Sequence, residues 1–143
     1  MPYCTLQDLI DRFGERALVA LTDRGAFAQG TVDEATVDRA IADTDATIDA
    51  YLAKRYALPL TPAQPLVKDI ALAIAFWKLH THAPDPKVEA DFREAMRQLQ
   101  QLAAGTMVLA AAGVPEAPGT GGTGARLTDR ARPFTEQNMK GFI

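Results

Sequence analysis

The two histidines of this chain are the side chains best suited to bind a metal ion. His80 and His82 lie two residues apart, and Asp85 follows them. Zinc sites in proteins use imidazole and carboxylate ligands, but side chains two apart on a helix point away from each other. No further histidine completes a set of four ligands. We therefore expect these residues to end a helix or lie on the surface, and we expect no metal.

The segment from Asp23 to Gly30 is a second candidate, because an aspartate opens it as in a calcium-binding loop. A calcium loop needs oxygen ligands at alternating positions, and here Gly25 and Phe27 occupy two of those positions. We therefore reject a calcium site and predict an ordinary loop.

The sequence also lacks the motifs of nucleophilic catalysis and of phosphate binding. Cys4 has no base beside it, the chain has no Gly-x-Ser-x-Gly or Walker motif, and the glycines at 119–124 do not join a strand to a helix. We predict that the protein is not an enzyme and uses no cofactor. A single cysteine excludes a disulfide within the chain and favours a reducing compartment.

One charge pattern remains. Glu34, Asp38, Asp45 and Asp49 lie within about 60° of each other on a predicted helix, at 100° per residue. This acidic stripe borders the apolar face. Three interpretations stay open: a solvated face, a contact with basic residues of another subunit, or a surface that repels nucleic acid.

The elements that would position these side chains are helices. Apolar residues recur every three or four positions in the first part of the chain, and 26 alanines against one tryptophan favour helix over strand. Thr5 is a capping residue with Asp8 three positions later, and it begins the first predicted helix, which ends at Phe13. Three longer helices are predicted over Asp33–Tyr56, over Leu66–His80 and from Val88 to Gly105, with a short helical piece over Glu15–Leu21.

The Leu66–His80 helix is apolar almost all round, so we expect it at the centre of an all-α bundle of about four helices, with Ile74 and Trp77 buried. After the last predicted helix, we expect Met107 to Leu109 to form either a short strand or a segment that packs on the bundle.

Composition changes after residue 112. Between Gly113 and Gly124 lie five glycines and two prolines, which predicts a flexible linker. Large apolar and basic side chains then return. We thus divide the chain into a helical body, residues 1–112, and a linker with a C-terminal docking arm, residues 113–143, whose candidate contact residues are Arg130, Arg132, Phe134, Met139, Lys140 and Phe142.

Size and charge limit the function. A chain of 143 residues with 48% hydrophobic and 23% charged residues is long enough for one domain with its own core. A net charge of −3 disfavours tight binding to duplex DNA. The first residues carry no secretion signal, and the longest apolar run, Ile70–Trp77, is too short to span a membrane, so we expect a soluble protein that is not exported.

Five motifs in order resemble those of the head–tail connector (adaptor) proteins of Mu-like phages and prophages. They are Arg12-Phe13-Gly14-Glu15, Leu21-Thr22-Asp23-Arg24, Ile48-Asp49-Ala50-Tyr51-Leu52, Arg55-Tyr56-Ala57-Leu58-Pro59-Leu60 and Pro133-Phe134-Thr135 with Met139-Lys140-Gly141-Phe142. The resemblance implies a virion structural protein that forms a ring, dodecameric in such phages, beneath the portal and joins the head to the tail.

The partners implied are the portal protein, a head-completion (stopper) or tail-terminator protein, other copies of the chain, and DNA that passes through without sequence-specific binding. The location implied is the head–tail junction of the virion, with the host cytoplasm during assembly. The alternative function is a small helical regulator that binds nucleic acid, which the negative charge and the lack of a basic recognition helix disfavour.

Overall fold

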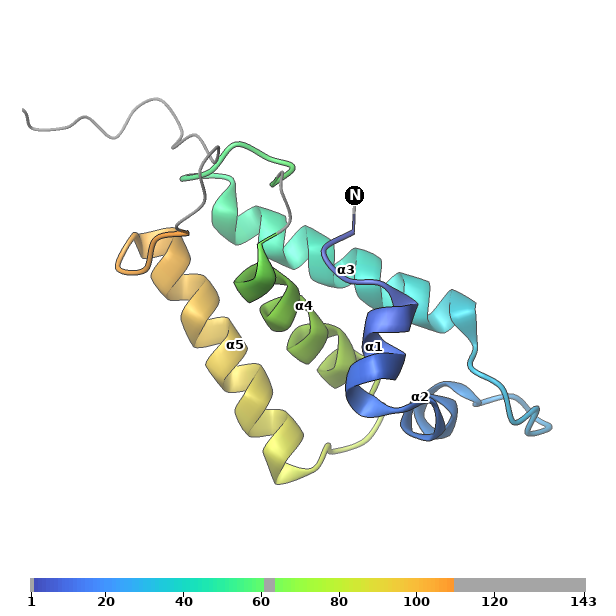
Figure 1. The fold of residues 1–143 in the computed structure, drawn as a ribbon. Helices are drawn as coiled ribbons and strands as arrows, with labels where there is room; N and C mark the ends of the chain where they lie inside the picture. The colour runs from blue at the N-terminus through green and yellow to red at the C-terminus, as the bar shows by residue number, and fades with distance from the viewer. Residues whose placement is uncertain (1, 61–63, 110–143) are drawn as a thin grey trace, which may run out of the picture.

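The computed structural model describes residues 2–60 and 64–109, and these residues form five α-helices and no strand (Figure 1). The helices are α1 (Leu6–Phe13), α2 (Glu15–Thr22), α3 (Glu34–Leu52), α4 (Pro65–Lys78) and α5 (Pro86–Ala104). The all-α prediction is confirmed. The fifth helix is α2, the short piece predicted after Phe13.

Local signals in the sequence set the ends of these helices. Thr5 and Asp8 form a capping box: the Thr5 hydroxyl accepts from the Asp8 backbone N–H at 3.3 Å, and Asp8 Oδ2 accepts from the Thr5 N–H at 3.0 Å. Gly14 separates α1 from α2 at φ +87°, and Gly105 ends α5 in the left-handed region at φ +79°. Pro65 opens α4, one residue before the predicted start at Leu66.

Helix α4 is the centre of the bundle, as predicted. It packs against α3, α5 and α1, and Figure 1 shows it between α3 and α5. Its side chains Val67, Ile70 and Ile74 are fully buried, so the helix is covered on several sides. On the α1 side, the ring of Phe76 stacks on that of Phe13 with centroids 3.8 Å apart.

Trp77 corrects one prediction: it is only partly buried, although we expected it in the core. It lies in the last turn of α4 and stacks on Phe92 of α5, with ring centroids 4.2 Å apart. A tryptophan side chain is large, so one that packs at the edge of the contact between two helices commonly keeps part of its ring in solvent. Its Nε1 is buried and has no hydrogen-bond partner among the described residues.

The helix predicted over Asp33–Tyr56 is shorter than expected, because α3 ends at Leu52. The chain turns after Leu52 and buries Tyr56 in the core instead of continuing the helix. The Tyr56 hydroxyl then accepts a hydrogen bond from the backbone N–H of Leu109 at 3.3 Å, and Leu109 is itself buried. Residues 107–109 therefore pack on the bundle rather than form a strand.

In the described part of the chain, the longer helices mix charged residues among their apolar ones, and none has the length and hydropathy needed to cross a membrane.

Candidate functional site

The predicted acidic stripe on α3 divides into two halves. Glu34 and Asp38, in its first turns, are exposed. Asp45 and Asp49 are half-buried because the N-terminal segment lies over them: the Tyr3 backbone N–H donates to Asp45 Oδ1 at 3.1 Å, and the Tyr3 hydroxyl donates to Asp49 Oδ1 at 2.5 Å. Only the first half is therefore free to meet a partner.

Burial shifts the protonation of the groups beneath this segment. Burial, followed by the hydrogen bond to Asp49, raises the pKa of the Tyr3 hydroxyl well above its usual range. Burial raises the pKa of Asp45, and the bond from Tyr3 partly opposes that shift. Cys4 is 1% exposed, and burial, with the nearby charges of Asp45 and Asp8, raises the pKa of its thiol to about 12. These groups hold the N-terminal segment on α3 and form no nucleophile.

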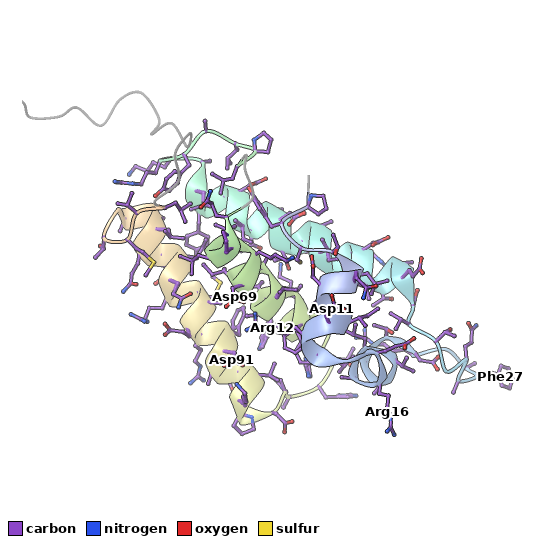
Figure 2. All side chains as sticks on the ribbon, viewed as in Figure 1. Asp11, Arg12, Arg16, Phe27, Asp69 and Asp91 are labelled. Carbon is purple, nitrogen blue, oxygen red and sulfur yellow. The ribbon has the colours of Figure 1, made fainter. Side chains whose placement is uncertain are left out.

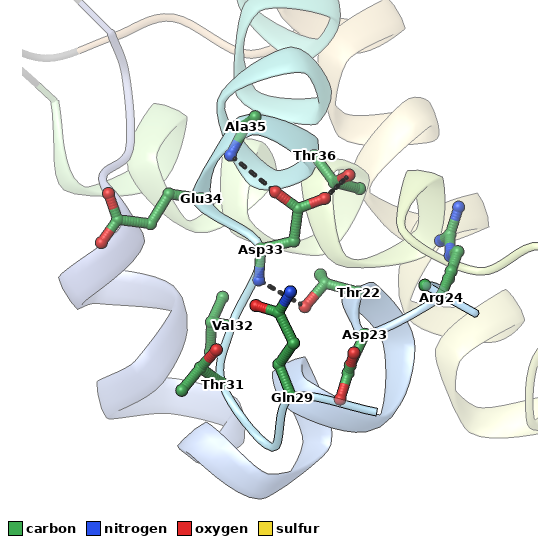
Figure 3. A pocket seen from close by; sticks show the side chains of 11 residues that line it. Thr22, Asp23, Arg24, Gln29, Thr31, Val32, Asp33, Glu34, Ala35 and Thr36 are labelled. Atoms are coloured by element: carbon green, nitrogen blue, oxygen red, sulfur yellow. Dashed lines mark hydrogen bonds between the residues drawn. The ribbon is translucent and has the colours of Figure 1, made fainter. Parts of the chain in front are cut away.

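The loop between α2 and α3 is tied together at its base. Thr22 is buried, its hydroxyl donates to the Leu18 carbonyl at 2.8 Å, and it accepts from the Asp33 N–H at 3.1 Å. At the next residue, Asp23, Oδ2 accepts from the Gly30 N–H at 2.9 Å. The hollow of about 610 Å³ inside this loop is lined mainly by polar groups (Figure 3).

Phe27 lies at the tip of this loop, and 86% of its surface is exposed. Figure 2 shows its ring directed away from the helical body, at the far end from α5. The hydrogen bonds close the base of the loop, and the Phe27 ring lies beyond that base, outside the bundle. Sequence reasoning used Phe27 only to reject calcium; an aromatic residue among Gly25, Ala26 and Ala28 was the available signal of an exposed contact residue.

A groove with basic walls lies on the other side of α3. It has a volume of about 420 Å³, and its charged or ionisable lining residues are Arg24, Arg39, Asp43, Lys78 and His80. Three cations against one carboxylate leave it with a net charge of +2 when the imidazole is neutral.

Hydrogen bonds hold the walls of this groove in place. Lys78 Nζ donates to the Asp43 carbonyl at 2.7 Å and to Thr47 Oγ1 at 3.1 Å. Arg24 donates to the backbone carbonyls of Leu21 and Leu79. Partial burial lowers the pKa of Lys78, and the charge of Asp43 opposes that shift. Sequence reasoning missed this groove because its residues come from three separate segments.

The histidine cluster is not brought together. His80 Nδ1 lies 2.9 Å from the Phe76 carbonyl at the end of α4, whereas His82 and Asp85 are exposed in the following turn. Among residues 2–60 and 64–109, no three side chains of His, Cys, Asp or Glu are grouped to hold a metal ion.

The predicted docking residues of the C-terminal arm lie outside the described residues. They are Arg130, Arg132, Phe134, Met139, Lys140 and Phe142.

Comparison with known proteins finds similarity to phage Mu and Mu-like prophage proteins over most of the chain. Over 102 residues the chain is 37% identical to "Gene product J" of Escherichia phage Mu, which covers 71% of this chain and 72% of that protein. Over 113 residues it is 28% identical to "Mu-like prophage FluMu protein gp36" of Haemophilus influenzae, with 79% of each chain covered. The model of the family described as "Bacteriophage Mu, Gp36" matches residues 3–126. The chain therefore belongs to the bacteriophage Mu Gp36 family.

Proposed function

We propose that the protein is a virion structural protein: a head–tail adaptor that forms a ring, dodecameric in our expectation, beneath the portal. In this role it joins the DNA-filled head to the tail and lines the channel through which DNA leaves. Membership of a phage Mu family supports this function, and so does the resemblance of its motifs to those of connector proteins. The proposed partners are the portal, a stopper or tail-terminator protein and further copies of the chain.

One observation carries the assembly role. Phe27 exposes 86% of its surface on a loop whose base is tied by Asp23 and Thr22. An aromatic ring held in water is unfavourable by about 1.5–3 kcal/mol relative to a buried one. Aromatic residues are enriched in the buried cores of protein–protein interfaces and among the residues that contribute most to binding. The exposed Phe27 therefore supports the proposal that this loop contacts a protein partner in the assembled particle.

The exposed half of the acidic stripe fits the same role. Glu34 and Asp38 carry negative charge on the surface of α3. If they face the ring lumen they repel DNA phosphates, and if they face a neighbouring subunit they attract its basic groups.

The C-terminal arm is proposed as the main portal-docking element. Phe134, Met139 and Phe142 would supply apolar anchors, and Arg130 and Arg132 can form bidentate pairs with carboxylates. Each further arm that docks in a ring does so at high effective concentration, so individually weak contacts sum to a stable joint.

The experiment is removal of the gene from a phage or prophage that carries it, with complementation from a plasmid. We expect DNA-filled heads and finished tails to accumulate separately, and the complementing protein to co-purify with joined particles as a ring at the portal. Joined particles at normal yield without the gene would contradict the proposal. A loss of late transcripts, with no heads formed, would instead support the nucleic-acid-binding regulator.

A truncated chain, residues 1–112, tests the arm. We expect it to keep its helical circular dichroism spectrum and to fail to join heads to tails. If the truncated chain joins them at normal yield, portal docking belongs to the helical body instead.

A further inference from the structure

Helix α3 carries opposite charges on its two flanks. Asp38 and Arg39 are successive residues, so their side chains leave the helix about 100° apart. The face of α3 that packs into the core carries Val37, Ile41 and Ile48, all buried. The two charged side chains therefore point to different sides of the helix, and neither is covered by the bundle.

The flank of Asp38 is the acidic one. Glu34 lies one turn earlier, about 40° away around the helix, and both carboxylates are exposed. Figure 3 shows the Glu34 carboxylate on one side of the first turn of α3, with Arg24 on the other side.

The flank of Arg39 is the wall of the basic groove. Arg39 Nε donates to the Ala35 carbonyl at 3.2 Å, and its remaining guanidinium donors have no carboxylate partner among the described ion pairs. Arg24 and Lys78 stand beside it in the groove. Asp43 is the one carboxylate that lines the groove, so its three cations keep an excess of two positive charges.

We propose that the acidic flank of one copy, Glu34 and Asp38, docks against the basic groove of the next copy, at Arg39 with Arg24 and Lys78. This contact rests on the proposed ring function and names its subunit interface. Two complementary patches on different sides of one chain form a heterologous contact, and repetition of such a contact closes a ring when the rotation fits. Complementary charge also fixes the register of neighbouring subunits. Carboxylates of a second copy fit this groove better than DNA phosphates because the chain as a whole has a net charge of −3.

The test exchanges the two charges. Asp38→Arg places a cation against the groove, and Arg39→Asp places a carboxylate against the acidic flank, so each single variant puts like charges across the contact. The double variant Asp38→Arg with Arg39→Asp restores opposite charges between positions 38 and 39 of neighbouring copies, leaves Glu34, Arg24 and Lys78 unchanged, and keeps the amino-acid composition. Both residues are exposed, so each variant should retain its helical spectrum and unfolding midpoint.

Sedimentation velocity of the full chain, in low salt and at increasing protein concentration, measures self-association. We expect each single variant to weaken association about tenfold, the double variant to recover most of that loss, and added salt to weaken the wild type. The matched control is the same exchange on α5, where Arg93 and Glu94 are also successive, opposite and exposed; Arg93→Glu and Glu94→Arg should leave association unchanged.

Three results would overturn the contact: a wild type that stays monomeric at every concentration, single variants that associate normally, or a double variant whose loss is the sum of the two singles. Loss of duplex DNA binding in Arg39→Asp with unchanged self-association would assign the groove to phosphates instead. Failure of the head–tail joining role would show separately in the gene-removal experiment, which does not depend on this contact.

Discussion

The hydroxyl of Tyr3 donates a 2.5 Å hydrogen bond to the carboxylate of Asp49, 46 residues further along the chain. The backbone N–H of the same residue donates to Asp45 one turn earlier on α3. These two bonds fasten the segment before α1 along the helix and cover half of the acidic stripe.

Replacement of Tyr3 by Phe tests this attachment. The variant keeps the ring but leaves the half-buried Asp49 carboxylate without its donor, so we expect the free energy of unfolding to fall by about 1–3 kcal/mol. Urea unfolding followed by circular dichroism measures the loss. Tyr51→Phe is the matched control, because no hydrogen bond of its hydroxyl is found in the described structure. Equal stability of Tyr3→Phe and wild type would mean that the bond contributes nothing.

Cys4 should be unreactive in the folded protein. Its thiol is 1% exposed and its pKa is raised to about 12, so at pH 8 both access and the thiolate fraction are low. We expect an aromatic disulfide reagent to react at least about 100-fold more slowly with the native protein than with the urea-unfolded one. A rapid reaction of the native protein with one equivalent of reagent would show that the N-terminal segment opens readily.

The sequence predicted the parts of the fold that depend on neighbouring residues. Thr5 with Asp8 at the start of α1 and Gly105 at the end of α5 act through local hydrogen bonds and backbone angles, and both helix ends lie where the sequence predicted them.

Features that depend on distant residues could not be read in this way. The Tyr3–Asp49 hydrogen bond and the groove formed by Arg24, α3 and the end of α4 exist only after the helices pack. The apolar pattern of α4 likewise predicted a core helix, but it could not show that Trp77 covers a seam at its end instead of entering the core.

Asp8 should make stability depend on acidity. The ion pair with Lys68 at 2.7 Å, together with the bonds to Thr5, holds the pKa of Asp8 below its ordinary value of 3.8. A carboxyl with a lowered folded pKa stabilises the protein fully above its unfolded pKa, and that stabilisation is lost as pH falls through the folded pKa. Asp8→Asn should therefore be about 1 kcal/mol less stable than wild type at pH 7, with the difference shrinking below pH 4.

Unfolding of both proteins in urea at several pH values measures this difference. Other groups, such as Asp45 with its raised pKa, titrate in both proteins and cancel in the comparison. A difference that stays constant down to pH 2 would show that Asp8 acts without its charge.

Ile70 tests the central position of α4. It is 1% exposed, and its replacement by Ala leaves a cavity where α4 meets its neighbours, so we expect a loss of about 2–5 kcal/mol in the free energy of unfolding. Val108→Ala is a control, since 54% of its surface is exposed and the expected change is within about 0.5 kcal/mol. Similar losses for both variants would contradict the central role of α4.

Phe27 separates assembly from folding. Because the ring is exposed and touches no core residue, Phe27→Ser should leave the helical spectrum and the unfolding midpoint unchanged, with a free-energy change within about 0.5 kcal/mol. In a phage complemented with this variant, we expect joined particles to fall about tenfold or more, because an aromatic anchor commonly contributes 2 kcal/mol or more to an interface. Ala28→Ser on the same exposed loop is the matched control and should join heads to tails normally. A normal yield of joined particles with Phe27→Ser would exclude the Phe27 side chain as an anchor. The contacts that join head to tail would then be assigned to α3 and the C-terminal arm.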